Sequence, residues 1–455
     1  MLKANPLSFT KLLLIPALFL FSLFGFSQEK NVHGMNVEEI HRLVETMVNY
    51  SPDSTLLLLN LASDKIKLIE DKELASKYWA ENNLRRADYL IYNRNNEFQS
   101  YLDNAYFYYS THVDNNKMAE IFILKAQRIR NLGNFKVEAV QSSMVYFDTA
   151  LVYAHKSNDP IILAFIYYEK AFALQRIEQW QASIENTLLS LEQAKLTDDS
   201  LAIASGLYLM GRTYNYFGFS EHAESYLEKS IGYAKGMYYL YSIHITYADI
   251  LLQNNKISLA LENYQLAVQQ CLLQDKKIIA IEIYTKIGQA QLKQDKYLLA
   301  EKTFEAINEL RNTIKYNGPR LVIFSAQMQQ RLGNSDLAIK KLQYFEANYL
   351  NEQFKSQDLE IYKDGAQLYS LLNLPKKASE FYLKWGTLKD SLHSHASKSQ
   401  LNELEKMYQN ERSKNLEISK KNEELEKSRF NQAALGGLIL LIILIGSMLI
   451  YFIRM

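Results

Sequence analysis

Small residues recur along the middle of the chain at intervals of 37 to 40 residues. These markers are Ala171, Gly211, Ala248, Gly288, Ala326 and Ala366. Twelve positions after each marker lies another small residue, namely Ser183, Ala223, Ala260, Ala300, Ala338 or Ala378. Four positions further on lies a residue that is mostly large and apolar, namely Thr187, Leu227, Tyr264, Phe304, Leu342 or Tyr382. Six successive units therefore share one register.

This register predicts pairs of antiparallel α-helices. Small residues are needed where two helix axes approach, and larger apolar residues fill the space beside the crossing. Each pair has an apolar face that it cannot bury alone, so the pairs are expected to stack into an α-solenoid with a concave surface. The chain has only 6 prolines and 16 glycines and no sustained two-residue alternation, which predicts an all-α fold. Most of the 32 tyrosines are expected between helices, with the hydroxyl at the edge.

One unit of the repeat resembles the tetratricopeptide repeat (TPR) closely. It reads Leu207-x-x-Met210-Gly211-x-x-Tyr214, followed by Gly218 in the turn and by Ala223, Leu227 and Ser230. The usual Trp of the family is replaced by Tyr, Leu, His or Val, and the closing Pro is mostly absent. The period also exceeds the family's value of about 34 residues, so longer turns or second helices are expected.

The resemblance sets the expected domain boundaries. It covers residues 160–391 well, and a degraded unit containing Ala126 and Phe147 extends it upstream. We therefore expect a TPR array over residues 111–391. Residues 28–110 read as helix pairs without a clean register and are expected to form atypical repeats that cap the same superhelix.

Both ends of the chain carry apolar stretches that predict a topology. Residues 433–453 are uncharged and long enough for a transmembrane helix. Residues 1–27 have basic, apolar and small-residue parts in the order of a secretory signal peptide, although an uncleaved anchor is the alternative. The expected protein is single-pass in the bacterial cytoplasmic membrane, with the array extracytoplasmic and residues 454–455 cytoplasmic. The basic residues just before the span point the other way under the positive-inside rule, but the signal peptide acts first.

Between the array and the span, residues 392–430 form a charged segment that predicts a helical stalk. Several apolar residues fit a heptad, but Glu411, Asn415 and Asn422 occupy core positions of the same frame. A homodimeric coiled coil and a single solvated helix both remain open. Ala433 and Gly437 form a small-xxx-small pair at the start of the span, which weakly favours a dimer.

Charge and motif content exclude several classes of function. The formal net charge of +1 gives no reason to expect nucleic-acid binding. Cys271 is alone, so no intrachain disulfide can form, and we expect it to be buried in a helix interface. His393 and His395 would point apart on a helix, and no catalytic, nucleotide-binding or metal-binding motif occurs. The chain is therefore expected to be neither an enzyme nor a cofactor-binding protein.

The TPR resemblance implies a binding groove lined by the first helix of each pair. The positions that it carries over are Phe165, Tyr168, Phe172, Arg176, Tyr208, Arg212, Asn215, Tyr216, Lys293, Arg320 and Arg331. Aromatic residues with Arg and Asn suit a peptide or an extended protein segment as the ligand. The alternative is that these side chains contact only water or neighbouring repeats.

The order of signal peptide, TPR array, stalk and single span resembles the sensor half of bacterial one-span histidine kinases and transcriptional regulators. Two hypotheses follow. The chain is a membrane-anchored module that binds a protein or peptide, or it is the sensor portion of a signal-transduction regulator whose output domain is missing or lies on a partner.

Overall fold

The computed structural model describes residues 34–47, 52–91, 97–234, 240–349 and 359–395, together with scattered positions between 406 and 428. The chain divides into two compact units, Met1–Leu383 and Lys384–Met455. All regular secondary structure in the described segments is helical. None of the helices found there has both the length and the apolar character that a membrane span needs. The expected signal peptide (1–27) and span (433–453) lie outside the described residues.

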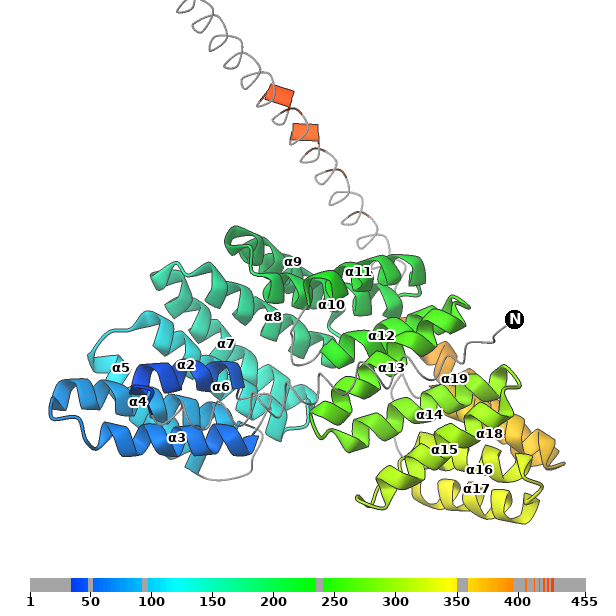
Figure 1. Cartoon of the computed structure of the whole chain (residues 1–455). Coiled ribbons are helices and arrows are strands. Elements are labelled where there is room, and N and C mark those ends of the chain that lie inside the picture. The colour runs from blue at the N-terminus through cyan, green and yellow to red at the C-terminus, as the bar shows by residue number, and fades with distance from the viewer. Residues whose placement is uncertain are drawn as a thin grey trace, which may run out of the picture. The chain divides into compact units, whose positions relative to one another are not determined.

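The helices of the first unit form consecutive antiparallel pairs, and the last of them, α19, extends beyond this unit (Figure 1). The pairs are α2 (Val37–Met47) with α3 (Pro52–Ile66), α4 (Lys72–Tyr89) with α5 (Glu97–Thr111), α6 (Asn115–Leu132) with α7 (Val137–Ser157), α8 (Pro160–Arg176) with α9 (Trp180–Thr197), α10 (Ser200–Tyr216) with α11 (Ser220–Tyr233), α12 (Leu240–Gln253) with α13 (Ile257–Leu273), α14 (Lys277–Lys293) with α15 (Tyr297–Arg311), α16 (Pro319–Arg331) with α17 (Ser335–Tyr349), and α18 (Leu359–Leu371) with α19 (Pro375–His395). The last helix continues past residue 391, where the array was expected to end.

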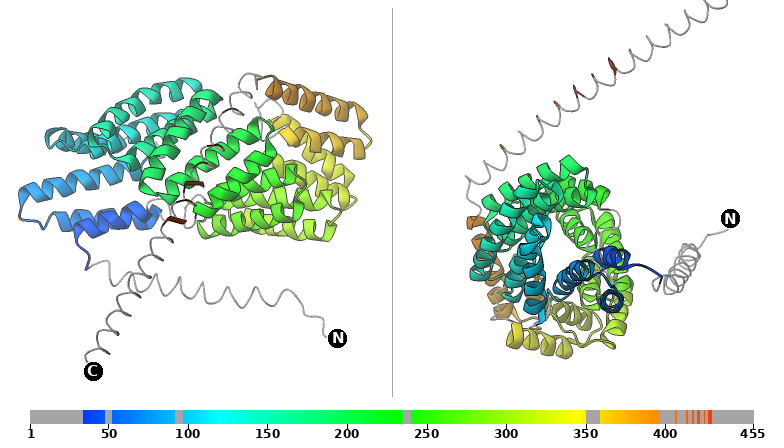
Figure 2. Two further views of the ribbon diagram at one scale, coloured as in Figure 1. Left: turned by 90° about the horizontal axis from the view of Figure 1, so that it is seen from above. Right: turned by 90° about the vertical axis from the view of Figure 1, so that its left-hand side faces the viewer.

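First helices of successive pairs also pack against one another, for example α6 with α8 and α8 with α10. Within this unit the pairs follow one another around a common axis (Figure 2). Close packing of first helix against first helix is the geometry of the inner side of a solenoid. The predicted all-α solenoid is confirmed.

The small markers lie where the two helices of a pair cross. Ser183 of α9 donates a hydrogen bond to the carbonyl oxygen of Ala171 in α8 at 2.9 Å. A Cβ atom on Gly211 would lie 2.7 Å from Cγ of Leu227. Both small residues are buried in all six units. In the last unit Tyr382 is 40% exposed, and its neighbour Phe381 is buried against Tyr362 and Tyr369. The register of small residues therefore holds in α19, but the large residue that is buried there is Phe381 and not the expected Tyr382.

Most turns contain one residue in the left-handed region, and the sequence supplies residues that tolerate it. Gly218 and Gly333 have φ of 83° and 80°, and Asn or Asp takes the same place in several other turns. Asp198 ends α9 at φ 53°, and Asp199 caps α10 by accepting hydrogen bonds from the backbone of Leu201 and Ala202. Short polar side chains tolerate this conformation and stop the helix, which accounts for the tight turns.

Tyrosine hydroxyls tie neighbouring pairs together through a carboxylate. In α13, Tyr264 donates to Asp249 of α12, and Lys286 of α14 binds the same carboxylate at 2.7 Å. In α5, Tyr109 donates to Glu81 of α4 at 2.8 Å, and this carboxylate binds a lysine of α6. The tyrosine ring packs between helices while its hydroxyl reaches a charged group at the edge, as expected from the composition.

Candidate functional site

The inner side of the solenoid carries a group of aromatic rings and guanidinium groups from α6, α8 and α10. We call it the arginine–aromatic cluster; its members are Arg130, Phe135, Tyr168, Phe172, Arg176, Tyr208 and Arg212. Five of these seven were predicted from the TPR resemblance. The structure brings those five together across two adjacent first helices.

Two phenylalanine rings form the centre of the cluster. Phe135 and Phe172 meet edge to face with their centroids 5.7 Å apart, and Tyr168 stacks on Phe172 at 6.3 Å. Spacings of four residues place Tyr168, Phe172 and Arg176 on one face of α8. Tyr208 and Arg212 share a face of α10 for the same reason.

Three guanidinium groups surround this pair of rings. Arg130 lies 5.1 Å from the centroid of Phe135 and 5.5 Å from that of Phe172. Arg176 lies 5.1 Å from Phe135, and Arg212 lies 6.0 Å from Phe172. Arg212 is also 5.6 Å from the ring of Tyr208. These are cation–π distances, so the rings hold the arginines in place through their flat faces.

The charge of the cluster is only partly balanced. Arg130 forms a buried ion pair with Glu169 at 2.6 Å. Within the described part of the chain, neither Arg176 nor Arg212 forms an ion pair with a carboxylate, and Nε of Arg176 is buried without a hydrogen-bond partner. Burial, followed by the neighbouring Arg212, lowers the pKa of Arg176 from its ordinary value. Among the described residues, the inner side at α8 and α10 therefore carries excess positive charge.

Three further predicted residues lie on the same two helices but differ in their surroundings. Phe165 is 43% exposed on α8. Asn215 has a buried side-chain oxygen for which the described residues provide no hydrogen-bond partner. Tyr216 stacks on Trp180 at the start of α9 with centroids 3.9 Å apart, so its ring packs between repeats.

The remaining predicted residues lie in later repeats and do not join the cluster. Lys293 of α14 pairs with the buried Asp364 of α18 at 3.5 Å, and Arg320 of α16 donates to Gln289 at 3.4 Å. Gln289 in turn donates to Asp364 at 3.0 Å. Lys293 and Arg320 thus have internal partners in a network that joins three first helices. Arg331 ends α16 and lies 4.3 Å from the ring centroid of Tyr297, where α15 begins.

Sequence reasoning missed Arg130 and Phe135. Phe135 lies in the turn after α6 at φ 58°, a conformation that a bulky residue rarely adopts. The repeat register is degraded in this unit, so the TPR positions could not be carried over onto it. The available sequence signal was Gly133 in the turn, which aligns this unit with Gly218 of the clean one.

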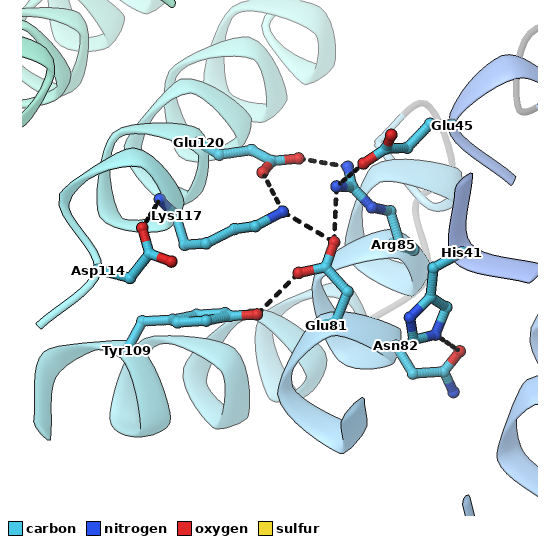
Figure 3. Close-up of polar contacts among 9 residues, drawn as sticks. All are labelled: His41, Glu45, Glu81, Asn82, Arg85, Tyr109, Asp114, Lys117 and Glu120. Atoms are coloured by element: carbon cyan, nitrogen blue, oxygen red, sulfur yellow. Dashed lines mark hydrogen bonds and ion pairs between the residues drawn. The ribbon is translucent and has the colours of Figure 1, made fainter. Parts of the chain in front are cut away.

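Further towards the N-terminus the inner side carries an ionic network instead (Figure 3). Arg85 of α4 forms ion pairs with Glu45 of α2 and Glu120 of α6, and with Glu81 at 2.6 Å. Lys117 of α6 binds Glu81 at 2.8 Å and Glu120 at 3.2 Å. These bonds join three first helices.

The carboxylates of this network have opposite pKa shifts. Burial opposes ionisation of Glu81, but Arg85 and Lys117 outweigh it and lower its pKa to about 2. Asp88 forms no ion pair with another described residue. Burial, followed by Glu120, raises the pKa of Asp88 to about 6, although Arg85 opposes the rise. The network therefore stabilises the N-terminal repeats through Glu81 and is strained by charge at Asp88.

Groups with reactive potential are enclosed elsewhere in the fold. Cys271 is fully buried in α13, as expected, and burial raises the pKa of its thiol to about 11. His244 is buried in α12, where its Nδ1 lies 2.8 Å from Oδ1 of Asn263, and burial lowers its pKa. Across the ranges that the structure describes, no group of histidine, cysteine and carboxylate side chains is arranged to hold a metal ion.

Comparison with known proteins places the fold among TPR-like helical repeats. The sequence matches no protein-family model and no curated protein. Among solved structures, the chain is similar to apo RapI, at a TM-score of 0.57 and 11% identity over 79% of this chain and 98% of that one. A Rap protein complexed with Competence and Sporulation Factor matches at a TM-score of 0.53 and 12% identity, over 79% of this chain and 99% of that one. A signal transduction ATPase with a tetratricopeptide repeat sensor from Pyrococcus horikoshii matches at a TM-score of 0.51 and 18% identity, over 72% of this chain and 50% of that one. At these identities the likeness establishes the TPR-like fold alone.

Proposed function

We propose that this chain is a protein-interaction module that binds a peptide or an extended protein segment along the inner side of its solenoid, and that it acts by binding and not by catalysis. The observation that carries the proposal is the arginine–aromatic cluster. Aromatic and arginine side chains provide large contact areas and strong hydrogen bonds with little loss of conformational entropy, so they dominate binding hot spots. The Rap protein of similar fold is complexed with Competence and Sporulation Factor, which lends support to a ligand in a solenoid of this kind.

A selection from a fully random peptide library on the immobilised full-length chain, in detergent, tests this proposal. We expect a family of related peptides to be enriched, and Arg212→Ala to weaken their binding about thirtyfold, since truncated anchors typically lose about 2 kcal/mol. Lys195→Ala is the matched control because Lys195 is an exposed cation on the second helix α9. Enrichment of no peptide, or equal binding by Arg212→Ala and the wild type, would reject the groove as the binding site.

We further propose that residues 433–453 anchor the protein in the bacterial cytoplasmic membrane, with the solenoid exported by the signal peptide at 1–27. The support is the sequence pattern of the two apolar stretches. Protease added to spheroplasts should degrade the solenoid, and deletion from Ala433 onward should release it. A solenoid that resists protease while a periplasmic control domain is cut would reject this orientation.

A second candidate function is the sensor portion of a one-span signal-transduction regulator. It is favoured by the expected order of array, stalk and span, and by the TPR array that serves as the sensor of the P. horikoshii ATPase. The stalk would then transmit a change in the array through the span, as a homodimer. DNA downstream of the gene discriminates the two functions: an in-frame kinase or DNA-binding domain supports the sensor, and an unrelated gene supports the stand-alone module.

A further inference from the structure

Arg176 and Arg212 are held side by side in the groove without a carboxylate partner among the described residues. Arg176 is held on Phe135, and Arg212 on Phe172 and Tyr208. In the part of the chain that the structure describes, the carboxylate that pairs with the cluster is that of Glu169, which is bound to Arg130. Two guanidinium groups therefore share this part of the groove with no negative charge to balance them.

This arrangement is unfavourable for the unbound protein. A partly buried cation loses hydration, and a second cation nearby adds repulsion. The lowered pKa of Arg176, caused by burial and then by Arg212, has the same origin. An anion bound between the two arginines would remove both penalties at once.

The geometry also leaves the right hydrogen-bonding groups available. A guanidinium group that stacks on a ring uses its flat face, so its N–H groups point outward at the edge. Those N–H groups match the two oxygens of a carboxylate in a bidentate fashion. Nε of Arg176 and Oδ1 of Asn215, three residues after Arg212, are both buried and have no hydrogen-bond partner among the described residues. The two guanidinium groups thus offer N–H donors that suit a carboxylate.

The rest of the inner side limits where an acidic group can bind. In the network of α2, α4 and α6, Arg85 and Lys117 are already paired with Glu45, Glu81 and Glu120 (Figure 3). Asp88 adds further negative charge there. In α14 and α16, Lys293 and Arg320 are engaged with Asp364 and Gln289. Of these three charged groups, only the cluster has two arginines without a carboxylate or amide partner among the described residues.

We infer that Arg176 and Arg212 recognise an aspartate or glutamate side chain of the bound segment, and that an apolar residue next to it packs on Phe172 and Tyr168. This inference rests on the proposed function, because it names the chemistry of the ligand of the same groove. The apolar neighbour follows from the stacked rings of Phe172 and Tyr168, which supply an apolar surface beside the two charges.

The test is the residue composition of peptides selected from the random library on the full-length wild type and on Arg176→Gln/Arg212→Gln. We expect wild-type selections to be enriched in Asp or Glu at one position, with an apolar residue beside it, and the double variant to lose this enrichment. A selected peptide should bind the double variant roughly ten- to hundredfold more weakly, the usual effect of charge-assisted hydrogen bonds. Changing its acidic residue to the amide should weaken wild-type binding equally and variant binding hardly at all.

Thermal unfolding distinguishes the proposed binding role of the two arginines from a structural role. Because these cations are unpaired, Arg176→Gln should leave the melting temperature unchanged or raise it, whereas loss of a structural contact would lower it. Lys195→Gln is the control for a general loss of positive charge. Selected peptides without an acidic preference, or with one that persists in the double variant, would overturn the inference and leave the proposed function standing. Enrichment of no peptide at all would overturn both.

Discussion

At the scale of single residues, two helical glycines differ in what surrounds them. A Cβ atom on Gly288 would lie 2.2 Å from Cζ of Phe324, a fully buried ring, whereas a Cβ atom on Gly232 would meet no atom of the described residues within 4 Å. We expect Gly288→Ala to lower the free energy of unfolding by about 1–3 kcal/mol, because overpacking outweighs the gain in helix propensity. Gly232→Ala should raise it by roughly 0.5–1 kcal/mol. Urea unfolding of both variants measures this, and a stabilised Gly288→Ala would contradict the close crossing.

The same scale shows which site residues the sequence can predict. Arg176 and Arg212 could be found because each lies near a clear marker, Ala171 or Gly211, and the marker fixes which face of the helix they occupy. Phe135 could not, because its place beside Phe172 depends on an unusual backbone conformation in a turn. The periodicity of the sequence predicts which face of a helix a residue occupies, but it does not predict the backbone conformation of a turn of this kind.

At the scale of elements, two neighbouring aspartates at the junction between α9 and α10 have different roles. The carboxylate of Asp199 accepts hydrogen bonds from the backbone of Leu201 at 2.9 Å and Ala202 at 3.1 Å, while Asp198 only occupies a left-handed position. We expect Asp199→Ala to destabilise the protein by about 1 kcal/mol through loss of the cap. Asp198→Gly should be neutral or slightly stabilising, since glycine adopts this conformation freely. Thermal unfolding compares the two, and equal losses would show that the cap is not what matters.

Helix pairing could be predicted more reliably than the identity of the buried aromatic residue at the end of the array. The offset of twelve residues between small positions fits two helices joined by a tight turn, and most pairs follow it. In α19 the sequence offers two adjacent aromatic residues, Phe381 and Tyr382, and period alone does not choose between them. Burial against Tyr362 and Tyr369 selects Phe381. Tertiary packing therefore decides which of two adjacent aromatic side chains is buried, a choice that the local pattern leaves open.

At the scale of the whole solenoid, stability is a sum over repeats and the contacts between them, so the ionic network of α2, α4 and α6 determines how firmly the N-terminal repeats join the rest. The sequence predicted atypical repeats here but not the network, because its members come from three helices far apart in the chain. Because the carboxylates of this network titrate, the stability of the junction depends on pH. Whether ionisation stabilises or destabilises it differs from one carboxylate to the next.

Asp88 and Glu81 should have opposite effects on this junction. The pKa of Asp88 is raised from 3.8 to about 6, so its ionisation destabilises the folded state increasingly between pH 4 and 6 and fully above pH 6. Asp88→Asn should therefore stabilise the N-terminal repeats at pH 8 by about 2 kcal/mol, and this gain should shrink as pH falls towards 4.

The pKa of Glu81 is lowered from 4.5 to about 2, so its ionised form stabilises the fold above pH 4.5, and this contribution is lost as pH falls through 2. Glu81→Gln should destabilise the same repeats at pH 8. Hydrogen exchange of α2, α4 and α6 at pH 8 measures both variants; the gain of Asp88→Asn at lower pH follows from urea unfolding monitored between pH 4 and 8. Protection lost in Asp88→Asn at pH 8 would show that its carboxylate is paired and not strained.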